Sequence, residues 1–454
     1  MVPSAITLPL PYTASLSGLA DKLAHLPGFV YLDSGDREFS AEMEIVAALP
    51  TTIHQLDDYS GNLSDWMTAV ERDISEGQDH HATLGSSGTF TGRIAIGSLD
   101  YNAPAAQLLG HVSHPSGTMA GIYHWLLVSH RPSKTTELLF HADCPAETRS
   151  AVLEALESQE PRQPSSFTMT RPFQAAISKQ DYQRAVERIQ AYILAGDCYQ
   201  VNFAQRFESV LKGDAWTAYR AIRDNLAGGF SAFIRPSPHH AILSLSPERF
   251  LKVRDGVVTT QPIKGTAPRH SDPEQDKKLA EALKGSEKDR AENVMITDLL
   301  RNDIGQFCEA GSVRVTELCG LHSFGNVHHL ISTVEGRLAS GTTAGQLLLA
   351  TSPGGSITGA PKKRAVEIIA ELEDFPRGAY CGSIFMLGGG DWLQSSIAIR
   401  TLEASNGNLY CWGGGGITAS SQWEAEYQET LDKVGPIMSA LEAASQCSGS
   451  SIPS

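Results

Sequence analysis

The sequence contains no apolar run of 18 residues, no Cys-x-x-Cys pair and no long basic run. The first absence argues against a helix that spans a membrane. The second, together with seven dispersed cysteines, favours reduced thiols and a cytoplasmic protein. The third, together with a formal net charge of −15, argues against a nucleic-acid partner. Residues 1–12 have no basic start and no long apolar core, so we expect no signal peptide.

Length and composition allow one large domain or two to three ordinary ones, because the chain has 454 residues and 41% hydrophobic content. Residues 1–155 contain no chemical motif. We predict a polar, proline-containing linker at 156–168, a catalytic part at 169–444 and a disordered tail at 445–454.

Turn and cap signals indicate an α+β fold with antiparallel strands rather than a parallel βαβ sheet. Asp255-Gly256, residues 388–390 and Asn406-Gly407 are predicted turns between apolar runs. The last two predict a three-stranded meander over 382–412. Cap patterns and apolar periodicity predict helices at 178–196, 271–283, 288–301, 363–372 and 421–443.

A lysine stands out at the end of one alternating apolar run, in Gln-Pro-Ile-Lys-Gly-Thr at 261–266. The hairpin around Asp255-Gly256 is expected to place Lys264 at the end of a strand, with Glu248 close by. The two side chains fit a nucleophile and an acid. An ordinary cross-strand ion pair, which contributes roughly 0.2–1 kcal/mol, is the reading that the spacing alone favours.

Two predicted helices each carry a carboxylate pair with a spacing of three, which puts both members on one face. The pairs are Asp289 with Glu292, and Glu426 with Glu429, the latter followed one turn later by Lys433. Four carboxylates suit Mg²⁺, a hard cation that prefers oxygen ligands. A solvated charged face is the alternative.

A glycine-rich loop at 352–362 leads into a predicted helix and offers backbone N–H groups to an anion. It lacks the Gly-Lys-Ser/Thr of a Walker A loop, so a carboxylate ligand is as plausible as a phosphate. A purely structural turn also fits the loop. Four glycines at 413–416 provide a second place where backbone can approach a ligand closely.

Six motifs occur in order between about 178 and 433. They are Leu-Ser-Pro-Glu-Arg-Phe at 245–250, Pro-Ile-Lys-Gly-Thr at 262–266, Asp-Arg-Ala-Glu-Asn at 289–293, Asp-Leu-Leu-Arg-Asn-Asp at 298–303, Pro-Gly-Gly-Ser-Ile-Thr-Gly-Ala-Pro-Lys at 353–362 and Glu-Tyr-Gln-Glu at 426–429. Together and in this order they resemble the chorismate-utilising enzymes, the family of anthranilate, isochorismate, salicylate and aminodeoxychorismate synthases, and residues 1–155 match more loosely. The resemblance implies a two-layer antiparallel β-sandwich core flanked by helices.

Two positions distinguish members within that family. Members that add water resemble one another in a lysine where this chain has Gln200, so ammonia is the expected nucleophile. Anthranilate-forming members have alanine at the position of Lys264, and lysine is typical of members that aminate C4 of chorismate for 4-aminobenzoate and folate synthesis. The alternatives are an anthranilate-forming enzyme and, from another class, a catalytically silent metal-binding regulatory subunit.

The resemblance also implies roles for individual residues. Lys264 is the expected nucleophile and Glu248 the general acid. Glu292 and Glu429, with Asp289 and Glu426 nearby, are the expected Mg²⁺ ligands. A separate glutamine amidotransferase subunit is the expected source of ammonia. The implied substrate-binding residues are Thr358, Gly359, Ala360, Tyr380, Arg400, Gly414, Gly415, Lys433 and His329.

The N-terminal part resembles the tryptophan-binding region of anthranilate synthases weakly, in Tyr-Leu-Asp-Ser at 31–34. Ser34 is the expected contact on that side, and Gly229, Phe230 and Ser231 form the expected opposite wall. A regulatory tryptophan, a structural tryptophan, an empty site and plain core packing all fit this pattern.

Overall fold

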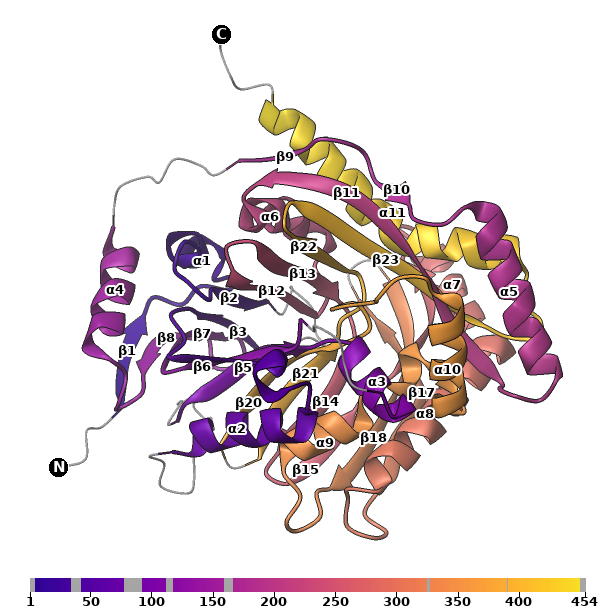
Figure 1. Cartoon of the computed structure of the whole chain (residues 1–454), viewed down its shortest axis with the longest axis horizontal. Coiled ribbons are helices and arrows are strands. Elements are labelled where there is room, and N and C mark those ends of the chain that lie inside the picture. The colour runs from indigo at the N-terminus through magenta and orange to yellow at the C-terminus, as the bar shows by residue number, and fades with distance from the viewer. Residues whose placement is uncertain are drawn as a thin grey trace.

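The computed structural model describes residues 5–33, 42–76, 92–111, 117–158, 166–324, 327–389 and 391–449. Two large antiparallel sheets form its centre, and helices cover their outer faces (Figure 1). This arrangement confirms the predicted α+β sandwich. No helix in the described part of the chain is both long and apolar enough to cross a membrane. Of the seven cysteines, six are described as free and buried.

The first sheet contains thirteen strands, and its main path runs β1-β8-β7-β3-β2-β12-β13-β22-β23-β11-β10. β9 and β19 also pair with β11. The strands are β1 (Ile6–Leu10), β2 (Val30–Asp33), β3 (Met43–Ala47), β7 (Trp125–His130), β8 (Thr135–Phe140), β9 (Phe167–Met169), β10 (Gln174–Ala175), β11 (Gln200–Gly213), β12 (Phe230–Ser237), β13 (His240–Ser246), β19 (Gly359–Ala360), β22 (Thr401–Ser405) and β23 (Asn408–Ile417).

The second sheet contains ten strands in the order β16-β18-β15-β14-β21-β20-β5-β6-β4, with β17 also paired to β18. The strands are β4 (Thr52–Gln55), β5 (Ile94–Leu99), β6 (Met119–Tyr123), β14 (Arg249–Arg254), β15 (Val257–Thr260), β16 (Ile263–Pro268), β17 (Arg314–Ser323), β18 (Val327–Arg337), β20 (Ser383–Gly388) and β21 (Trp392–Ile397).

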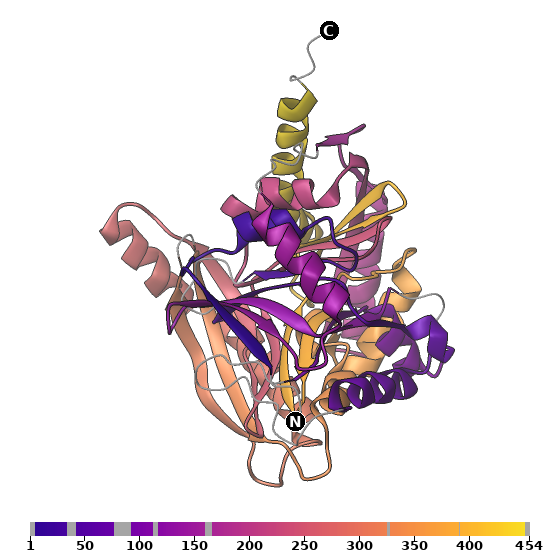
Figure 2. The ribbon, with the colours of Figure 1, turned by 90° about the vertical axis from the view of Figure 1, so that its left-hand side faces the viewer.

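Helices lie outside the sheets, and α11 packs against β23, α6 and α5. Figure 2 shows the salmon-coloured segment that contains α7 projecting from one side of the molecule. The helices are α1 (Ser17–Leu23), α2 (Leu63–Ser75), α3 (Asn102–Leu109), α4 (Ala146–Glu157), α5 (Lys179–Leu194), α6 (Ala215–Leu226), α7 (Pro273–Gly285), α8 (Glu287–Gly305), α9 (Ala344–Thr351), α10 (Lys362–Leu372) and α11 (Trp423–Gly449), with short 3-10 turns η1 (Leu56–Tyr59) and η2 (Gly355–Ile357).

Alternation along β12 shows how the strands divide their side chains between two cores. Ala232 and Ile234 belong to the core between the sheets. Phe233, between them in sequence, belongs to the core under α1, α6 and α11. Successive side chains of a strand point to opposite faces, so a strand with both faces covered is apolar throughout.

The predicted meander over 382–412 is wrong, because the segment forms two hairpins in different sheets. β20 and β21 pair in the second sheet, whereas β22 and β23 pair in the first. The chain crosses between the sheets at Ile399 and Arg400, and Arg400 has a φ of +51°. Local turn signals predicted both hairpins correctly but carried no information about which sheet each one joins.

Strands from the first 155 residues pair directly with strands of the later part in both sheets. β2 pairs with β12, and β5 pairs with β20. α4 ends at Glu157 and β9 begins at Phe167, on either side of the predicted linker, most of which lies outside the described residues. At the other end, α11 continues to Gly449, into the segment that we predicted to be a disordered tail.

Candidate active site

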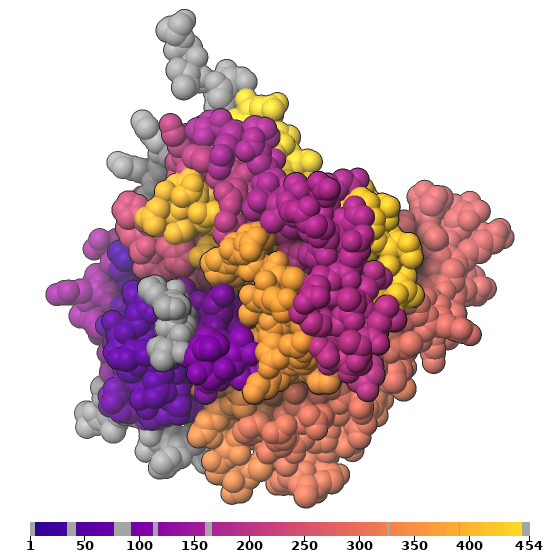
Figure 3. Space-filling model, turned by 45° about the vertical axis from the view of Figure 1, so that its right-hand side comes forward, coloured from indigo at the N-terminus to yellow at the C-terminus, as the bar shows by residue number. Residues whose placement is uncertain are grey.

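One large cavity brings most of the predicted site residues together. Its volume is about 510 Å³, and it is lined by residues of β16, α8, β23 and α11. In Figure 3 the salmon and yellow segments that carry the two carboxylate pairs lie at the right of the molecule. The predicted residues that line it are Glu248, Lys264, Asp289, Glu292, His329, Tyr380, Arg400, Gly414, Glu426, Glu429 and Lys433.

Lys264 lies on a strand of its own, not at the end of the predicted hairpin. β14 and β15 form that hairpin around Asp255-Gly256, as predicted, and β15 ends at Thr260. β16 then pairs with β18, with Lys264 opposite Leu330. The strand pairing of the lysine therefore depends on a segment more than sixty residues further along the chain.

A bulge at Gly265 directs Lys264 toward the cavity. Lys264 pairs with Leu330 and Thr266 with His329, so Gly265 is an extra residue in the ladder, with φ +78°. A Cβ at position 265 would lie 2.9 Å from the Cβ of Asp289, so α8 requires glycine there. Bulges of this kind re-aim neighbouring side chains, and here both Lys264 and Thr266 line the cavity.

Ser356 connects the two predicted catalytic groups. Its hydroxyl donates to Glu248 Oε1 (2.9 Å), and its backbone oxygen accepts from Lys264 Nζ (3.3 Å). Burial raises the pKa of Glu248, although the charge of Lys264 opposes this rise. Burial lowers the pKa of Lys264 against the opposing charge of Glu248. Both shifts favour the uncharged forms, a protonated acid and a neutral amine.

The carboxylate pairs lie on two helices that reach the same cavity. Ser286 caps the start of α8 by accepting from Asp289 N, and its hydroxyl also donates to the Asp289 carboxylate. Ser421, two residues before α11, donates to Oε1 of Glu426 on that helix (2.6 Å). These local hydrogen bonds hold Asp289 and Glu426 in place.

Charge is unevenly distributed over the four carboxylates. Burial raises the pKa of Glu292 and of Glu426. Burial also acts to raise the pKa of Glu429, but the charge of Lys433 and its 2.7 Å hydrogen bond outweigh that effect and lower the pKa. Crowded carboxylates with raised pKa values are the arrangement that a bound cation relieves.

The glycine run at 413–416 lets β23 pass close to these groups. A Cβ at Gly415 would lie 3.1 Å from Glu426 Oε2 and 3.6 Å from Glu429 Oε1. Lys433 Nζ also donates to the backbone oxygen of Gly414 (2.9 Å). Glycine therefore leaves free space beside the carboxylates of α11, where a larger residue would intrude.

Tyr380, Arg400 and His329 also line the cavity. Tyr380 stacks on Trp412, with ring centroids 6.0 Å apart and planes within 4°. His329 Nδ1 shares a hydrogen bond with Thr266 Oγ1 (2.9 Å). An arginine and a tyrosine on one cavity wall can hold a second carboxylate of a ligand.

The structure does not bring Thr358, Gly359 and Ala360 to the cavity lining. Gly359 and Ala360 form β19 and pair with β11, and the Thr358 hydroxyl donates to Gly354 O (2.9 Å). Sheet pairing occupies the backbone that we expected to bind an anion. The same loop lines the cavity through Ser356 and Ile357 instead.

The predicted tryptophan wall divides between two smaller cavities. Phe230 and Ser231 line one with Leu32 and Asp33, and its volume is about 50 Å³. Gly229 lines another, together with Phe230 and His329. Ser34 lies outside the described residues, so tryptophan binding stays a prediction.

Sequence reasoning missed several groups of the cavity, among them Ser356, Lys288 and Thr266. Lys288 lies four residues before Glu292 on α8, with Nζ 4.0 Å from Glu292 Oε1, a spacing that is visible in the sequence. Ser356 lies inside the quoted glycine-rich motif, but nothing local shows that it contacts Glu248, 108 positions earlier.

Comparisons with known proteins agree with this geometry. A family model described as chorismate binding enzyme matches residues 29–439. Aminodeoxychorismate synthase component 1 of Escherichia coli K12 is 41% identical over 438 residues, 93% of this chain and 95% of that protein. The Klebsiella aerogenes protein of the same name is 51% identical over 324 residues, 71% of this chain and 70% of that protein.

Among solved structures, anthranilate synthase component I from Streptococcus pneumoniae superposes with a TM-score of 0.75. It is 28% identical and covers 88% of this chain and 92% of that one. The two sheets and the cavity lined by carboxylates, Lys264 and Glu248 agree with the class of protein that the family model describes. The chain belongs to the family of chorismate binding enzymes.

Proposed function

We propose that this protein is component 1 of an aminodeoxychorismate synthase, which converts chorismate and ammonia to 4-amino-4-deoxychorismate for 4-aminobenzoate and folate synthesis. One observation carries the proposal: Lys264 and Glu248 share a cavity wall and are joined through Ser356. The relatives named aminodeoxychorismate synthase component 1 support it. By resemblance, an anthranilate-forming site would have alanine in place of Lys264.

The residues at one end of the cavity fit a magnesium ion. Asp289, Glu292, Glu426 and Glu429 offer only carboxylate oxygens, the ligands that Mg²⁺ prefers. We propose that Glu292 and Glu429 hold the ion, with Asp289 and Glu426 acting directly or through water. Bound there, Mg²⁺ would neutralise and orient the ring carboxylate of chorismate.

The first chemical step of the proposed mechanism uses the uncharged pair. Lys264 Nζ forms a bond to C2 of the ring, and the bond between C4 and its hydroxyl oxygen breaks. Glu248 donates its proton to the departing oxygen, which leaves as water. Covalent catalysis of this kind divides one difficult displacement into two easier ones. The burial that lowers the pKa of Lys264 and raises that of Glu248 supports these roles.

The second step restores both groups. Ammonia forms a bond to C4 while the bond between C2 and the Lys264 nitrogen breaks, which frees the lysine as a neutral amine. The new ammonium at C4 returns one proton to Glu248. The net reaction exchanges a hydroxyl for an amino group with no oxidation or reduction. We propose that Arg400 and Tyr380 hold the enolpyruvyl carboxylate during both steps.

Ammonia is proposed to come from a separate glutamine amidotransferase subunit, consistent with relatives whose name contains "component 1". Glutamine hydrolysis of that type needs a reactive thiolate. Burial raises the pKa of the Cys144, Cys198, Cys308, Cys381 and Cys411 thiols, so none of these is an activated nucleophile.

Product analysis tests the proposed function. The purified chain is incubated with chorismate, ammonium and Mg²⁺, and the products are separated by chromatography. We expect 4-amino-4-deoxychorismate as the main product. Anthranilate as the main product would instead assign the rival activity. No turnover in the presence of a working amidotransferase would favour a regulatory subunit.

Magnesium dependence should be sensitive to Glu292. We expect chelation to abolish turnover, and Glu292→Gln to raise the Mg²⁺ concentration needed for half-maximal rate by about tenfold or more, because a charged ligand is lost. Initial rates measured over a range of Mg²⁺ concentrations check this. Asp298→Asn is the matched control, since that carboxylate lies on the exposed face of α8, paired with Arg301. An equal effect of both substitutions would contradict the assignment.

Removing the Ser356 hydroxyl should shift the pH optimum upward. Its hydrogen bond lowers the pKa of Glu248, opposing burial, so Ser356→Ala raises that pKa further. Because turnover requires one proton shared by Glu248 and Lys264, raising either pKa moves the centre of a bell-shaped profile to higher pH. We also expect kcat to fall about 10- to 100-fold, as the lost bond contributes roughly 1.5–3 kcal/mol. Ser356→Thr, which retains a hydroxyl, should show a smaller change in both.

A further inference from the structure

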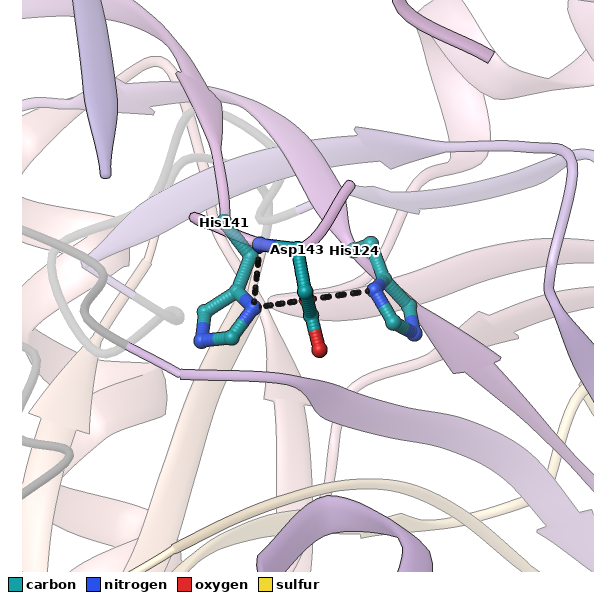
Figure 4. A group of neighbouring side chains, drawn as sticks. All are labelled: His124, His141 and Asp143. Carbon is teal, nitrogen blue, oxygen red and sulfur yellow. Dashed lines mark hydrogen bonds and ion pairs between the residues drawn. The ribbon is translucent and has the colours of Figure 1, made fainter. Parts of the chain in front are cut away.

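Outside the active-site cavity, His124, His141 and Asp143 converge where the chain passes between the two sheets (Figure 4). His124 lies between β6 of the second sheet and β7 of the first, and His141 directly follows β8. The His141 N–H donates to His124 O (2.7 Å), which extends the β7–β8 ladder by one pair and places the two rings side by side. Asp143 follows in the turn before α4.

Both imidazole rings present Nδ1 to the same carboxylate oxygen. His124 Nδ1 lies 2.8 Å from Asp143 Oδ1, and His141 Nδ1 contacts the same atom. One ligand atom from each of the three residues lies within 4.8 Å of the others. His124 and His141 are buried, whereas the Asp143 side chain is 38% exposed, which leaves one side open to solvent.

Further contacts hold each ring. Thr51 Oγ1 lies 3.0 Å from His124 Nε2, and the backbone N–H of Asp143 lies 3.4 Å from His141 Nδ1. A neutral imidazole that carries its proton on Nε2 offers a lone pair on Nδ1, the atom that each ring turns toward Asp143. Two imidazole nitrogens and one carboxylate oxygen therefore meet in one place, and all three are atom types that bind cations.

We propose that His124, His141 and Asp143 bind a zinc ion that links the segment between β6 and β7 to the segment that follows β8. Two imidazole nitrogens favour Zn²⁺ over Mg²⁺, and three protein ligands leave a fourth position for water. Tetrahedral zinc holds such ligands about 3.4 Å apart, so His124 Nδ1 and Asp143 Oδ1, now 2.8 Å apart, need to separate by less than ~1 Å.

Neighbouring residues complete the site. Arg93 donates to the other Asp143 oxygen, Oδ2 (3.0 Å from Nε), and leaves Oδ1 to face the rings. Thr51 holds the ring of His124, in the way that hydrogen-bonded partners commonly orient metal-binding histidines. The Arg93 charge opposes a cation, but Arg93 also faces Glu76 (3.9 Å) and donates to Asp73 O (2.9 Å).

Zinc content and thermal stability of the full chain test this proposal. Chelator-treated protein is dialysed against Zn²⁺ with millimolar Mg²⁺ present to occupy the cavity carboxylates, and bound zinc is measured by mass spectrometry. We expect the wild type to hold one more zinc per chain than H124Q/H141Q. At a zinc concentration about 100 times Kd, Tm should rise by about 3 °C in the wild type only.

Three further variants separate the possible outcomes. His54→Gln is the matched control, because His54 is a buried histidine paired with one aspartate, Asp73, and no second histidine. It should keep the extra zinc, as should Glu292→Gln in the cavity. If H124Q/H141Q does not fold, Asp143→Asn should weaken zinc binding at least ~10-fold. Equal zinc content in the wild type and the cluster variants would contradict the proposal. A protein that is stabilised by lower pH but does not respond to zinc would also contradict it, because the cluster would then bind protons rather than a metal ion.

Discussion

Replacing Lys264 with alanine should abolish amination of chorismate, with kcat at least ~10³-fold lower. The reason is the bulge at Gly265, which aims the only amine of β16 into the cavity beside Glu248. Without that amine no bond to C2 forms, and ammonia would have to displace the C4 hydroxyl in a single step. The measurement is product formation from chorismate and ammonium, combined with intact-protein mass after exposure to chorismate.

A mass adduct on wild-type protein that is absent from Lys264→Ala would identify the covalent intermediate. Lys252→Ala provides the control, because burial also lowers the pKa of Lys252 but that lysine lies on β14 outside the cavity lining. Thermal unfolding should show that Lys264→Ala remains folded, since burial disfavours a charge at this position and alanine carries none. Turnover within tenfold of the wild type would rule out the covalent role.

Replacing Glu248 with glutamine should lower kcat by about 10²–10⁴-fold, the usual contribution of a positioned general acid. The shape of the surviving pH profile is equally informative. Turnover by the wild type requires one proton shared between Glu248 and Lys264, so its pH–rate profile is bell-shaped. The variant needs only a neutral Lys264, so its rate should rise with pH and level off.

The rising limb of Glu248→Gln should report the titration of Lys264 beside a neutral side chain. The negative charge of an ionised Glu248 raises the pKa of Lys264, and glutamine removes that charge at every pH. Initial rates over a pH series measure both effects. Glu44→Gln is the control, since burial raises the pKa of that glutamate in the N-terminal part, away from the cavity. A bell that persists in Glu248→Gln would assign the acid to another group.

Local signals predicted the elements of this protein well. The Asp255-Gly256 turn produced the β14–β15 hairpin, and the caps at Ser178, Asp272 and Ser286 begin α5, α7 and α8. These signals act through backbone sterics and hydrogen bonds within a few residues, so a short segment contains all the information needed. The carboxylate pairs were predicted in the same way, because residues three positions apart on a helix lie on the same face.

Predictions that depended on distant partners were less successful. The meander was wrong because β21 pairs with β14 and β22 with β13, a choice made by burial in two separate cores. The loop at 352–362 was expected to present its backbone to a ligand, but pairing with β11 occupies Gly359 and Ala360. Motif resemblance supplied the identities of the site residues, which local reasoning alone left as ion pairs or solvated faces.

By itself, the sequence determined the family, several helices and hairpins, and the residue types available for chemistry. Only the tertiary structure decided that a bulge turns Lys264 inward, that Ser356 joins it to Glu248, and that His124, His141 and Asp143 meet at a sheet crossing. The physical reason is that these contacts connect segments separated by tens to hundreds of residues. Their approach is set by which apolar faces are buried together, and short stretches of sequence do not contain that information.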